Sequence, residues 1–352
     1  MKNGLLMLLM MTMSVGLKAQ TEAQKNQAAQ EAERKAKMEA SMKLEDKEGW
    51  VRKAGIGLDL GQLINVNPYI GGGSNRIGIG GAIAYSAVYK RNLLKWKNDI
   101  NFNLSTQRIG AGVIAIGSDQ QIPFEKALDI FTVGSNLAYQ VKEGSPWAYS
   151  VDFLLISQLL PSHVDSATKK TYLSPTNEGI YNTTLVSKFF NPANITLAPG
   201  IKYQKSKNWY AFLSPAALKL IYVADQNIAN LGVHGTKKKD NSNEYERSQL
   251  GLGAMARVGY SNTFFKRLNY TSELILYSNY LDKPQNIDVN WFNTIGIEIF
   301  KGFNLQFKAD AFYDHDKLNS ITDANAIGGL SGATGRRVNF IQQLLLTYNR
   351  NF

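Results

Sequence analysis

The segment WKNDINFNLST, residues 96–106, alternates apolar and polar side chains along its whole length. In an extended chain Trp96, Ile100 and Phe102 lie on one face, whereas Lys97 and Asp99 lie on the other. A strand of this kind suits an apolar medium on one side and a polar interior on the other. The segment therefore predicts a strand in the wall of a membrane barrel.

The same two-residue period recurs along the chain. It is clear in residues 130–142, 268–280 and 303–313 and weaker in 54–63, 76–90, 147–158, 194–206, 208–224, 248–262, 288–301 and 338–352. Each run is long enough to cross a bilayer as a tilted strand, which needs about ten residues. The pattern predicts about twelve strands in all.

The connections between these runs alternate between short and long. Short ones fall at residues 91–95, 143–146, 205–208, 265–267 and 301–302, and long ones at 64–75, 107–127, 159–192, 225–245, 281–287 and 316–336. In an up-and-down barrel this alternation sorts the tight turns to one rim and the long loops to the other. We therefore expect an all-β fold, a closed antiparallel up-and-down transmembrane barrel over residues 50–352, with a short helical N-terminal arm.

The N-terminal residues differ in composition from the rest. Residues 1–19 join a basic start to a short apolar run and end on a small residue, which predicts a cleaved signal peptide. Residues 20–49 are rich in Ala, Glu, Lys and Gln, which predicts a charged helical arm in the periplasm. The rest of the sequence contains no run of about 18 apolar residues, so it predicts no membrane helix. The expected location is the outer membrane.

Aromatic residues mark the expected rims. Trp96, Trp147 and Trp209 each open a strand just after a short turn, which predicts one aromatic girdle, and Trp291 near a long loop predicts the opposite one. The last strand ends on aromatic residues at alternating positions, as in the signal that barrel-assembly machinery reads. The residues of this assembly signal are Tyr348 and Phe352.

The polar faces of the predicted strands carry charges of both signs. Because unpaired charge inside a narrow barrel is costly, we expect paired networks. Balanced signs favour a narrow or closed lumen over an ion-selective pore. The residues predicted to line the lumen are Lys97, Asp99, Asp152, Lys202, Lys219, Arg257, Glu273, Glu298, Lys308 and Asp310.

Little in the sequence favours catalysis. The chain has no cysteine and 3 histidines, and none of these lies on a lipid-facing strand position beside a matching serine. A rim site for a divalent cation at Asp314, His315 and Asp316 lacks the spacing of a calcium loop, since Leu318 stands where a ligand belongs. The formal net charge is +11, but the basic residues are scattered, so nucleic acid is not expected. We expect no catalytic residue, no metal and no cofactor.

Four segments resemble an uncharacterised family of Gram-negative outer-membrane barrels of the Bacteroidetes type, known only as a domain of unknown function. They are NPYIGGGSNRIGIG at residues 67–80, LVSKFFNPANITLAPGIKY at 185–203, YAFLSPAALKLIYV at 210–223 and LYSNYLDKPQNIDVNW at 276–291. The resemblance implies the fold and the location, and it implies no activity.

Two classes of function remain open from the sequence. One is a narrow channel or transporter for a small solute, whose site is built from inward polar side chains and long loops. The other is a non-enzymatic accessory barrel that docks onto a larger envelope complex. The expected partners are outer-membrane lipid, the barrel-assembly machinery and, for the second class, another envelope protein.

Overall fold

The computed structural model describes residues 47–66, 76–108, 125–166, 171–175, 182–315, 319–322 and 330–351. The predicted signal peptide, the arm up to residue 46 and Phe352 lie outside these residues.

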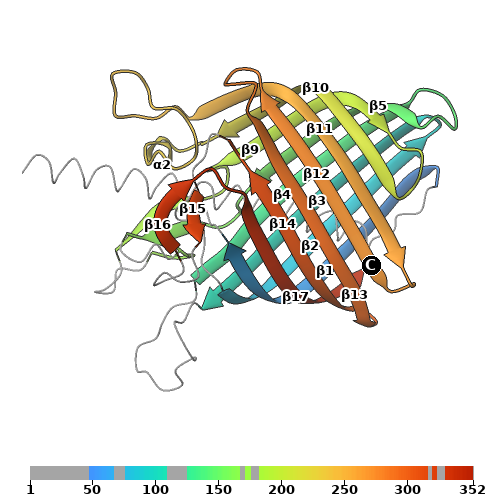
Figure 1. Cartoon of the computed structure of the whole chain (residues 1–352), viewed down its shortest axis with the longest axis horizontal. Coiled ribbons are helices and arrows are strands. Elements are labelled where there is room, and N and C mark those ends of the chain that lie inside the picture. The colour runs from blue at the N-terminus through green and yellow to red at the C-terminus, as the bar shows by residue number, and fades with distance from the viewer. Residues whose placement is uncertain are drawn as a thin grey trace, which may run out of the picture.

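Twelve long strands form the body of the molecule (Figure 1). They are β1 (Gly49–Val66), β2 (Arg76–Arg91), β3 (Leu94–Arg108), β4 (Glu125–Gln140), β5 (Trp147–Ser157), β9 (Ala193–Tyr203), β10 (Trp209–Tyr222), β11 (Ser248–Phe264), β12 (Leu268–Asn279), β13 (Ile287–Phe300), β14 (Phe303–Tyr313) and β17 (Asn339–Asn351).

These strands make one closed antiparallel barrel. Each strand pairs with the long strands next to it in sequence, and β17 pairs with both β14 and β1, which closes the ring. In the closing pair Leu60 lies opposite Leu346 and Leu58 lies opposite Tyr348. Closure leaves no strand edge unpaired, as a bilayer requires. The structure confirms the fold predicted from the two-residue period, including all twelve expected strands.

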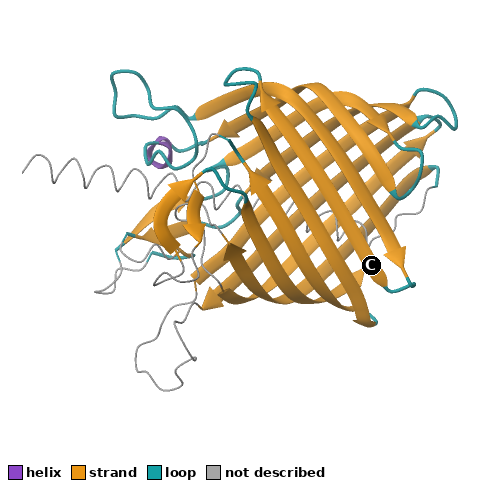
Figure 2. Cartoon of the chain, in the orientation of Figure 1, coloured by secondary structure: helices purple, strands orange, loops and turns teal. Residues whose placement is uncertain are grey.

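The two ends of the barrel differ, as the connections predict. The tight turns after β2, β4, β9, β11 and β13 lie at one end, and the longer connections lie at the other (Figure 2). The turn after β11, residues 265–267, places Phe265 and Lys266 at positive φ angles of 51° and 62°, as the two central residues of a type I′ turn require. We call the two ends the short-turn rim and the long-loop rim.

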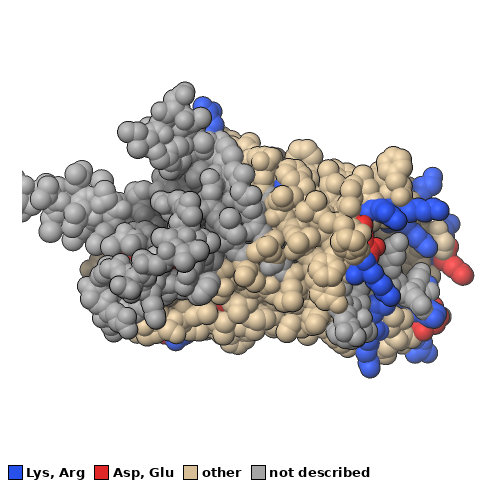
Figure 3. Space-filling view, turned by 90° about the horizontal axis from the view of Figure 1, so that it is seen from below, with Lys and Arg blue, Asp and Glu red and all other residues tan. Residues whose placement is uncertain are grey.

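The outer surface between the rims is apolar. Between the rims most outward positions of the described strands carry no Asp, Glu, Lys or Arg, although Asp129 pairs with the outward Leu104, and Arg350, at the short-turn end of β17, pairs with the outward Ile56. The face drawn in Figure 3 shows a middle band with few charged side chains. A belt of exposed aliphatic residues is the lipid-facing surface of a transmembrane barrel. Representative outward side chains, exposed by 40–65%, are Ile56, Leu58, Leu60, Ile79, Ile83, Ile100, Leu213, Leu250, Val258, Ile295, Leu305 and Leu346.

No helix among the described residues is long and apolar enough to cross a membrane.

Small elements cover part of the long-loop rim. The strands β6 (Ser162–Asp165), β7 (Thr171–Tyr172) and β8 (Thr183–Ser187) form a three-stranded sheet, and β15 (Asn319–Thr322) pairs with β16 (Leu330–Gly335). Helix α2 (Gln226–Ala229) buries Ile228 and Ala229 against Val223 and the partly buried Leu185 of β8. These contacts tie the β10–β11 connection to the β8 segment.

A buried histidine lies in this connection. His234 is 1% exposed, and its Nε2 lies 2.8 Å from the carbonyl oxygen of Val186. Burial lowers the pKa of His234 from 6.5 to about 4, because the charged imidazolium loses its hydration, although the bond to Val186 acts in the opposite direction. The folded loop therefore holds a neutral imidazole at neutral pH.

The apolar outward belt predicts that an outward arginine substitution destabilises the barrel more in the middle of the bilayer than at its edge. Ile83 and Tyr149 are similarly exposed, at 59% and 62%, but Ile83 lies midway along β2 and Tyr149 lies beside the short-turn rim. We expect Ile83→Arg to lower the free energy of unfolding in phospholipid vesicles by about 2–4 kcal/mol, and Tyr149→Arg by about 0–1 kcal/mol. Guanidinium titration measures both. Equal, small effects would mean that water, not lipid, surrounds Ile83.

His234 predicts that acid loosens the long-loop rim. The unfolded loop takes up a proton near pH 6.5 and the folded loop only near pH 4, so stability falls as the pH falls between these values. We expect a loss of about 2 kcal/mol between about pH 7 and pH 4.5, read as faster hydrogen exchange in residues 223–247. The variant His234→Gln should exchange at a rate that no longer depends on this protonation. An unchanged acid response in that variant would assign the effect to another group.

Candidate functional site in the barrel lumen

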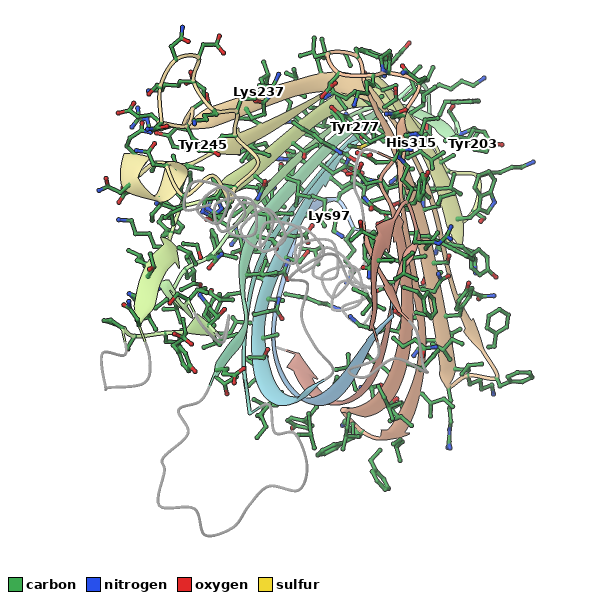
Figure 4. The ribbon with its side chains drawn as sticks, turned by 60° about the vertical axis from the view of Figure 1, so that its left-hand side comes forward. Lys97, Tyr203, Lys237, Tyr245, Tyr277 and His315 are labelled. Atoms are coloured by element: carbon green, nitrogen blue, oxygen red, sulfur yellow. The ribbon has the colours of Figure 1, made fainter. Side chains whose placement is uncertain are left out.

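The lumen contains a cavity of about 500 Å³ in the half nearer the short-turn rim. Strands β3, β4, β5, β9, β10, β11, β12 and β13 contribute to its wall. Six of the residues predicted to line the lumen are in this wall: Lys97, Asp99, Asp152, Lys202, Arg257 and Glu273. Figure 4 shows Lys97 pointing into the barrel, whereas Tyr203 lies on its outside.

An arginine network crosses one side of the cavity. The Arg257 guanidinium on β11 donates from Nη1 to Oδ2 of Asp152 on β5, at 2.9 Å, although β9 and β10 separate these strands. Its Nε lies 4.0 Å from Oε1 of Glu273 on β12, beyond hydrogen-bond distance. Asp152 also accepts a hydrogen bond from the Asn136 amide on β4. The network thus joins carboxylates that lie far apart around the ring.

A glycine makes room for the aromatic part of this network. A Cβ atom at Gly259 would lie only 2.3 Å from the ring of Tyr210 on the neighbouring strand. The Tyr210 ring therefore packs flat against the β11 backbone, and its hydroxyl donates to the Glu273 carboxylate. The Lys202 ammonium lies 5.0 Å from the centre of the same ring, a cation–π contact.

A second ion pair lies on the opposite side. Lys97 Nζ is 3.7 Å from Asp99 Oδ2, and the Ser86 hydroxyl donates to Asp99 Oδ1 at 2.6 Å. Further polar groups on β3 to β5 are buried inside the barrel. They are Asn101, Asn103, Thr132 and Ser150. Strands β2 to β5 therefore present a polar wall to the lumen.

The facing wall is apolar and aromatic, which the sequence analysis missed. Phe212 and Met255 pack with Tyr277 in one buried cluster, and Phe292 packs with Phe312 in another, with ring centres 5.5 Å apart. All five are inward-facing, and none of them is among the residues predicted to line the lumen. A signal was available, since Phe212 and Phe292 occupy the opposite parity to the outward Leu213 and Trp291.

Four other residues predicted to line the lumen lie away from the cavity wall. Lys219 Nζ lies over the ring of Tyr277 at 3.4 Å, and Lys308 and Asp310 are fully buried farther along the lumen. Glu298 is exposed at the β13–β14 turn, where it accepts a hydrogen bond from the Gly302 amide at 3.1 Å. A register shift between Glu298 and Phe300 ends the regular alternation there, so Glu298 caps a turn instead of lining the lumen.

The predicted girdle residues lie on the outside of the barrel. Trp96 forms a cluster with Trp50 and Tyr89. The Trp50 ring centre lies 5.9 Å from that of Trp96 and 5.2 Å from that of Tyr89. Trp50 was not among the predicted girdle residues. Trp147 and Trp209 both pack on Tyr203, at 4.6 and 5.4 Å. Together they form an aromatic girdle at the short-turn rim.

The remaining predicted aromatic positions are placed as follows. Trp291 is 48% exposed on β13, and its indole Nε1 donates to the Ser272 hydroxyl at 3.0 Å. Tyr348 of the predicted assembly signal packs on Phe303, at 4.7 Å.

The histidines and acidic residues do not assemble a metal centre among the described residues. His163 lies in β6, His234 is buried under the long-loop rim, and the His315 ring lies 3.0 Å from the Tyr313 hydroxyl. Asp316 of the considered cation site lies outside the described residues. What the lumen offers instead is a wall with charged groups and a facing wall with aromatic rings.

The arginine network predicts a measurable coupling. Removal of either partner of the Arg257–Asp152 pair leaves a partly buried charge without its counter-ion, so Arg257→Met should cost about 2 kcal/mol of unfolding free energy. With Asp152→Asn, a double-mutant cycle should give a coupling of about 1–2 kcal/mol. The exposed pair Lys239–Glu244, which is 2.8 Å apart, is the control and should show no measurable coupling. A result without coupling at Arg257 would show that the pair is incidental.

Several solved structures share the barrel shape. An outer-membrane channel from Pseudomonas putida F1 is 13% identical, with a TM-score of 0.41, over 87% of this chain and 97% of that chain. The NanC porin is 7% identical, with a TM-score of 0.40, over 83% and 98%. The translocator domain of the autotransporter NalP from Neisseria meningitidis is 9% identical, with a TM-score of 0.40, over 95% and 99%.

Comparison with curated proteins finds no match. A family model, by contrast, matches the chain from the end of β1 through β5 and into β6. The expected resemblance to a family known only as a domain of unknown function is confirmed over residues 62–163, which match the family described as "Protein of unknown function (DUF3078)", and the other three resembling segments lie outside this match.

Proposed function

We propose that the protein is a narrow outer-membrane channel for a small solute that has an apolar body and a negatively charged end. The observation that carries this proposal is the lumen cavity of about 500 Å³, whose wall combines charged groups with aromatic rings, so that Lys202 lies over the ring of Tyr210 and Arg257 over that of Phe212. Cavities of this size bind small ligands through apolar walls and a few well-placed polar groups.

The cationic groups of the cavity support the negative end. The described residues place no carboxylate within ion-pair distance of Lys202, whose ammonium instead faces the ring of Tyr210. The Nε of Arg257 has no hydrogen-bond partner among the described residues. The Lys202 ammonium therefore retains donors for an anionic ligand, whereas the Nε–H of Arg257 is enclosed by protein atoms and this residue contributes its positive charge.

The aromatic wall supports the apolar body. Tyr210, Phe212 and Phe292 line the cavity opposite Lys97 and Asp99. A fully polar solute would leave these rings against its hydrated groups, whereas an apolar body would remove their surface from water. The cations Lys202 and Arg257 lie directly beside Tyr210 and Phe212, so an apolar body packed on these rings brings an attached anionic group to the cations.

The accessory-barrel alternative also has an observation in its favour. Beyond the cavity, Phe312 and Ile341 pack with Phe292, and Lys308 and Asp310 are fully buried. A lumen filled in this way is rigid and narrow. An accessory barrel that docks onto an envelope complex does not need an open lumen, so this filling is compatible with that role. This alternative predicts no conductance and co-purification of another envelope protein.

Conductance of the purified barrel in a planar bilayer tests the proposal. We expect a small, steady conductance with a preference for anions in the wild type. Lys202→Gln should lower the anion-to-cation permeability ratio by about fivefold, because one unit charge at about 4 Å contributes about 1 kcal/mol even at the dielectric of water. Lys205→Gln is the matched control, because Lys205 lies three residues along the chain and outside the cavity wall.

Two results would contradict the channel. One is a folded wild-type barrel that gives no conductance, which would favour the accessory role. The other is a permeability ratio that Lys202→Gln and Lys205→Gln change equally, since the lumen site would then have no part in selection.

A further inference from the structure

The short-turn rim gathers most of the positive charge of the molecule. All five tight turns, and the start of β1, carry or adjoin basic residues, and Figure 3 shows them clustered at this end of the barrel. Twelve basic residues lie there, against the three acidic residues Glu48, Glu143 and Glu298. The twelve are Lys47, Arg52, Lys90, Arg91, Lys95, Lys142, Lys205, Lys207, Lys266, Arg267, Lys301 and Arg350.

The long-loop rim has no such excess. Its described side chains include nine basic residues and ten acidic ones, so their charges nearly cancel. The formal net charge of the whole chain is +11. The excess is therefore a property of one rim and not of the composition at large.

Two of the three acidic residues of the short-turn rim accept hydrogen bonds from backbone amides. Glu48 Oε2 accepts a hydrogen bond from the Asn92 amide at 3.2 Å, across the β2–β3 turn. Glu298 accepts from the Gly302 amide in the β13–β14 turn. These carboxylates hold turns in place, and three glutamates cannot neutralise twelve basic side chains.

These twelve basic residues, which we call the basic ring, lie directly beside the aromatic girdle. Arg52 points outward, and its guanidinium carbon lies 5.5 Å from the centre of the Trp50 ring. Lys90 and Arg91 follow Tyr89, which packs on Trp50. Since an aromatic girdle marks the depth of the membrane interface, the basic side chains next to it lie at the depth of the lipid headgroups.

Exposed phenylalanines alternate with the basic residues in two turns. Phe265 is 90% exposed beside Lys266, and Phe300 is 71% exposed beside Lys301. An apolar ring next to a cationic head is the arrangement of side chains that lie at a lipid interface.

We propose that the short-turn rim is a binding surface for anionic phospholipid headgroups. Lysine and arginine near an anionic leaflet are attracted to it, and the guanidinium of arginine binds phosphate oxygens through two parallel hydrogen bonds. The ring runs around the whole circumference, as lipid does, whereas a protein partner would be expected on one side. The inference does not depend on whether the lumen conducts.

The rim tryptophans provide a reporter for the test. The barrel is refolded in phosphatidylcholine vesicles that contain a minor fraction of brominated phosphatidylglycerol or, in parallel, of brominated phosphatidylcholine. Trp50, Trp96, Trp147 and Trp209 all lie at this rim, so their quenching reports the lipid next to it. We expect stronger quenching by phosphatidylglycerol, from an enrichment of about fivefold for each basic residue that contacts a phosphate. High salt should abolish the difference.

Two matched variants locate the effect. The rim variant combines Arg52→Gln, Arg91→Gln, Lys266→Gln and Arg267→Gln, and should lose most of the preference. The control variant makes four equal changes at the long-loop rim, Lys237→Gln, Lys238→Gln, Lys239→Gln and Lys283→Gln, and should keep it. Far-ultraviolet circular dichroism checks that both are folded.

The proposal is overturned if wild-type quenching is the same for the two brominated lipids, or if the preference persists in high salt. It is also overturned if the control variant loses the preference as fully as the rim variant. The salt titration needs only the wild-type barrel, so the test stands even where a variant does not fold.

Discussion

The pairing of β17 with both β1 and β14 is the constraint on which the rest of the structure depends. In lipid no water is available for an unpaired amide or carbonyl, and each such group costs several kcal/mol. With β17 in place, the backbone of the first strand and that of the last are bonded to one another, for example at Leu60 and Leu346. Closure also fixes the register of every strand, and a slip of one residue would exchange the lipid face and the lumen face of that strand.

Fixed register in turn determines what the lumen holds. Gly259 lies beside Tyr210 only because β10 and β11 pair as they do, and a side chain at that position would displace the tyrosine ring that bonds to Glu273. Arg257 reaches Asp152 across two intervening strands because the barrel wall is strongly curved there. The charged network is thus a consequence of closure, and the cavity beside it is the space that this network and the aromatic rings leave unfilled.

The sequence predicts the parts of the structure that depend on local alternation. All twelve strands follow from the two-residue period, and six of the ten residues predicted to line the lumen do lie in the cavity wall. What it does not predict depends on long-range packing. Aromatic residues such as Phe292 face inward because a facing Phe312 fills the space beside them, and Glu298 leaves the lumen because a register shift ends the alternation.

Position relative to the bilayer determines what a basic residue can do in this fold. Inside the barrel a guanidinium has lost much of its hydration, so Arg257 needs the carboxylate of Asp152 to be stable there. On the belt neither water nor a counter-ion is available, and the outward positions between the rims accordingly carry few basic residues. At the short-turn rim Arg52 lies on the face of Trp50 with its charge directed to the interface. One residue type therefore serves as a structural ion pair in the lumen and as part of an extended positive surface at the rim, and the local dielectric separates the two roles.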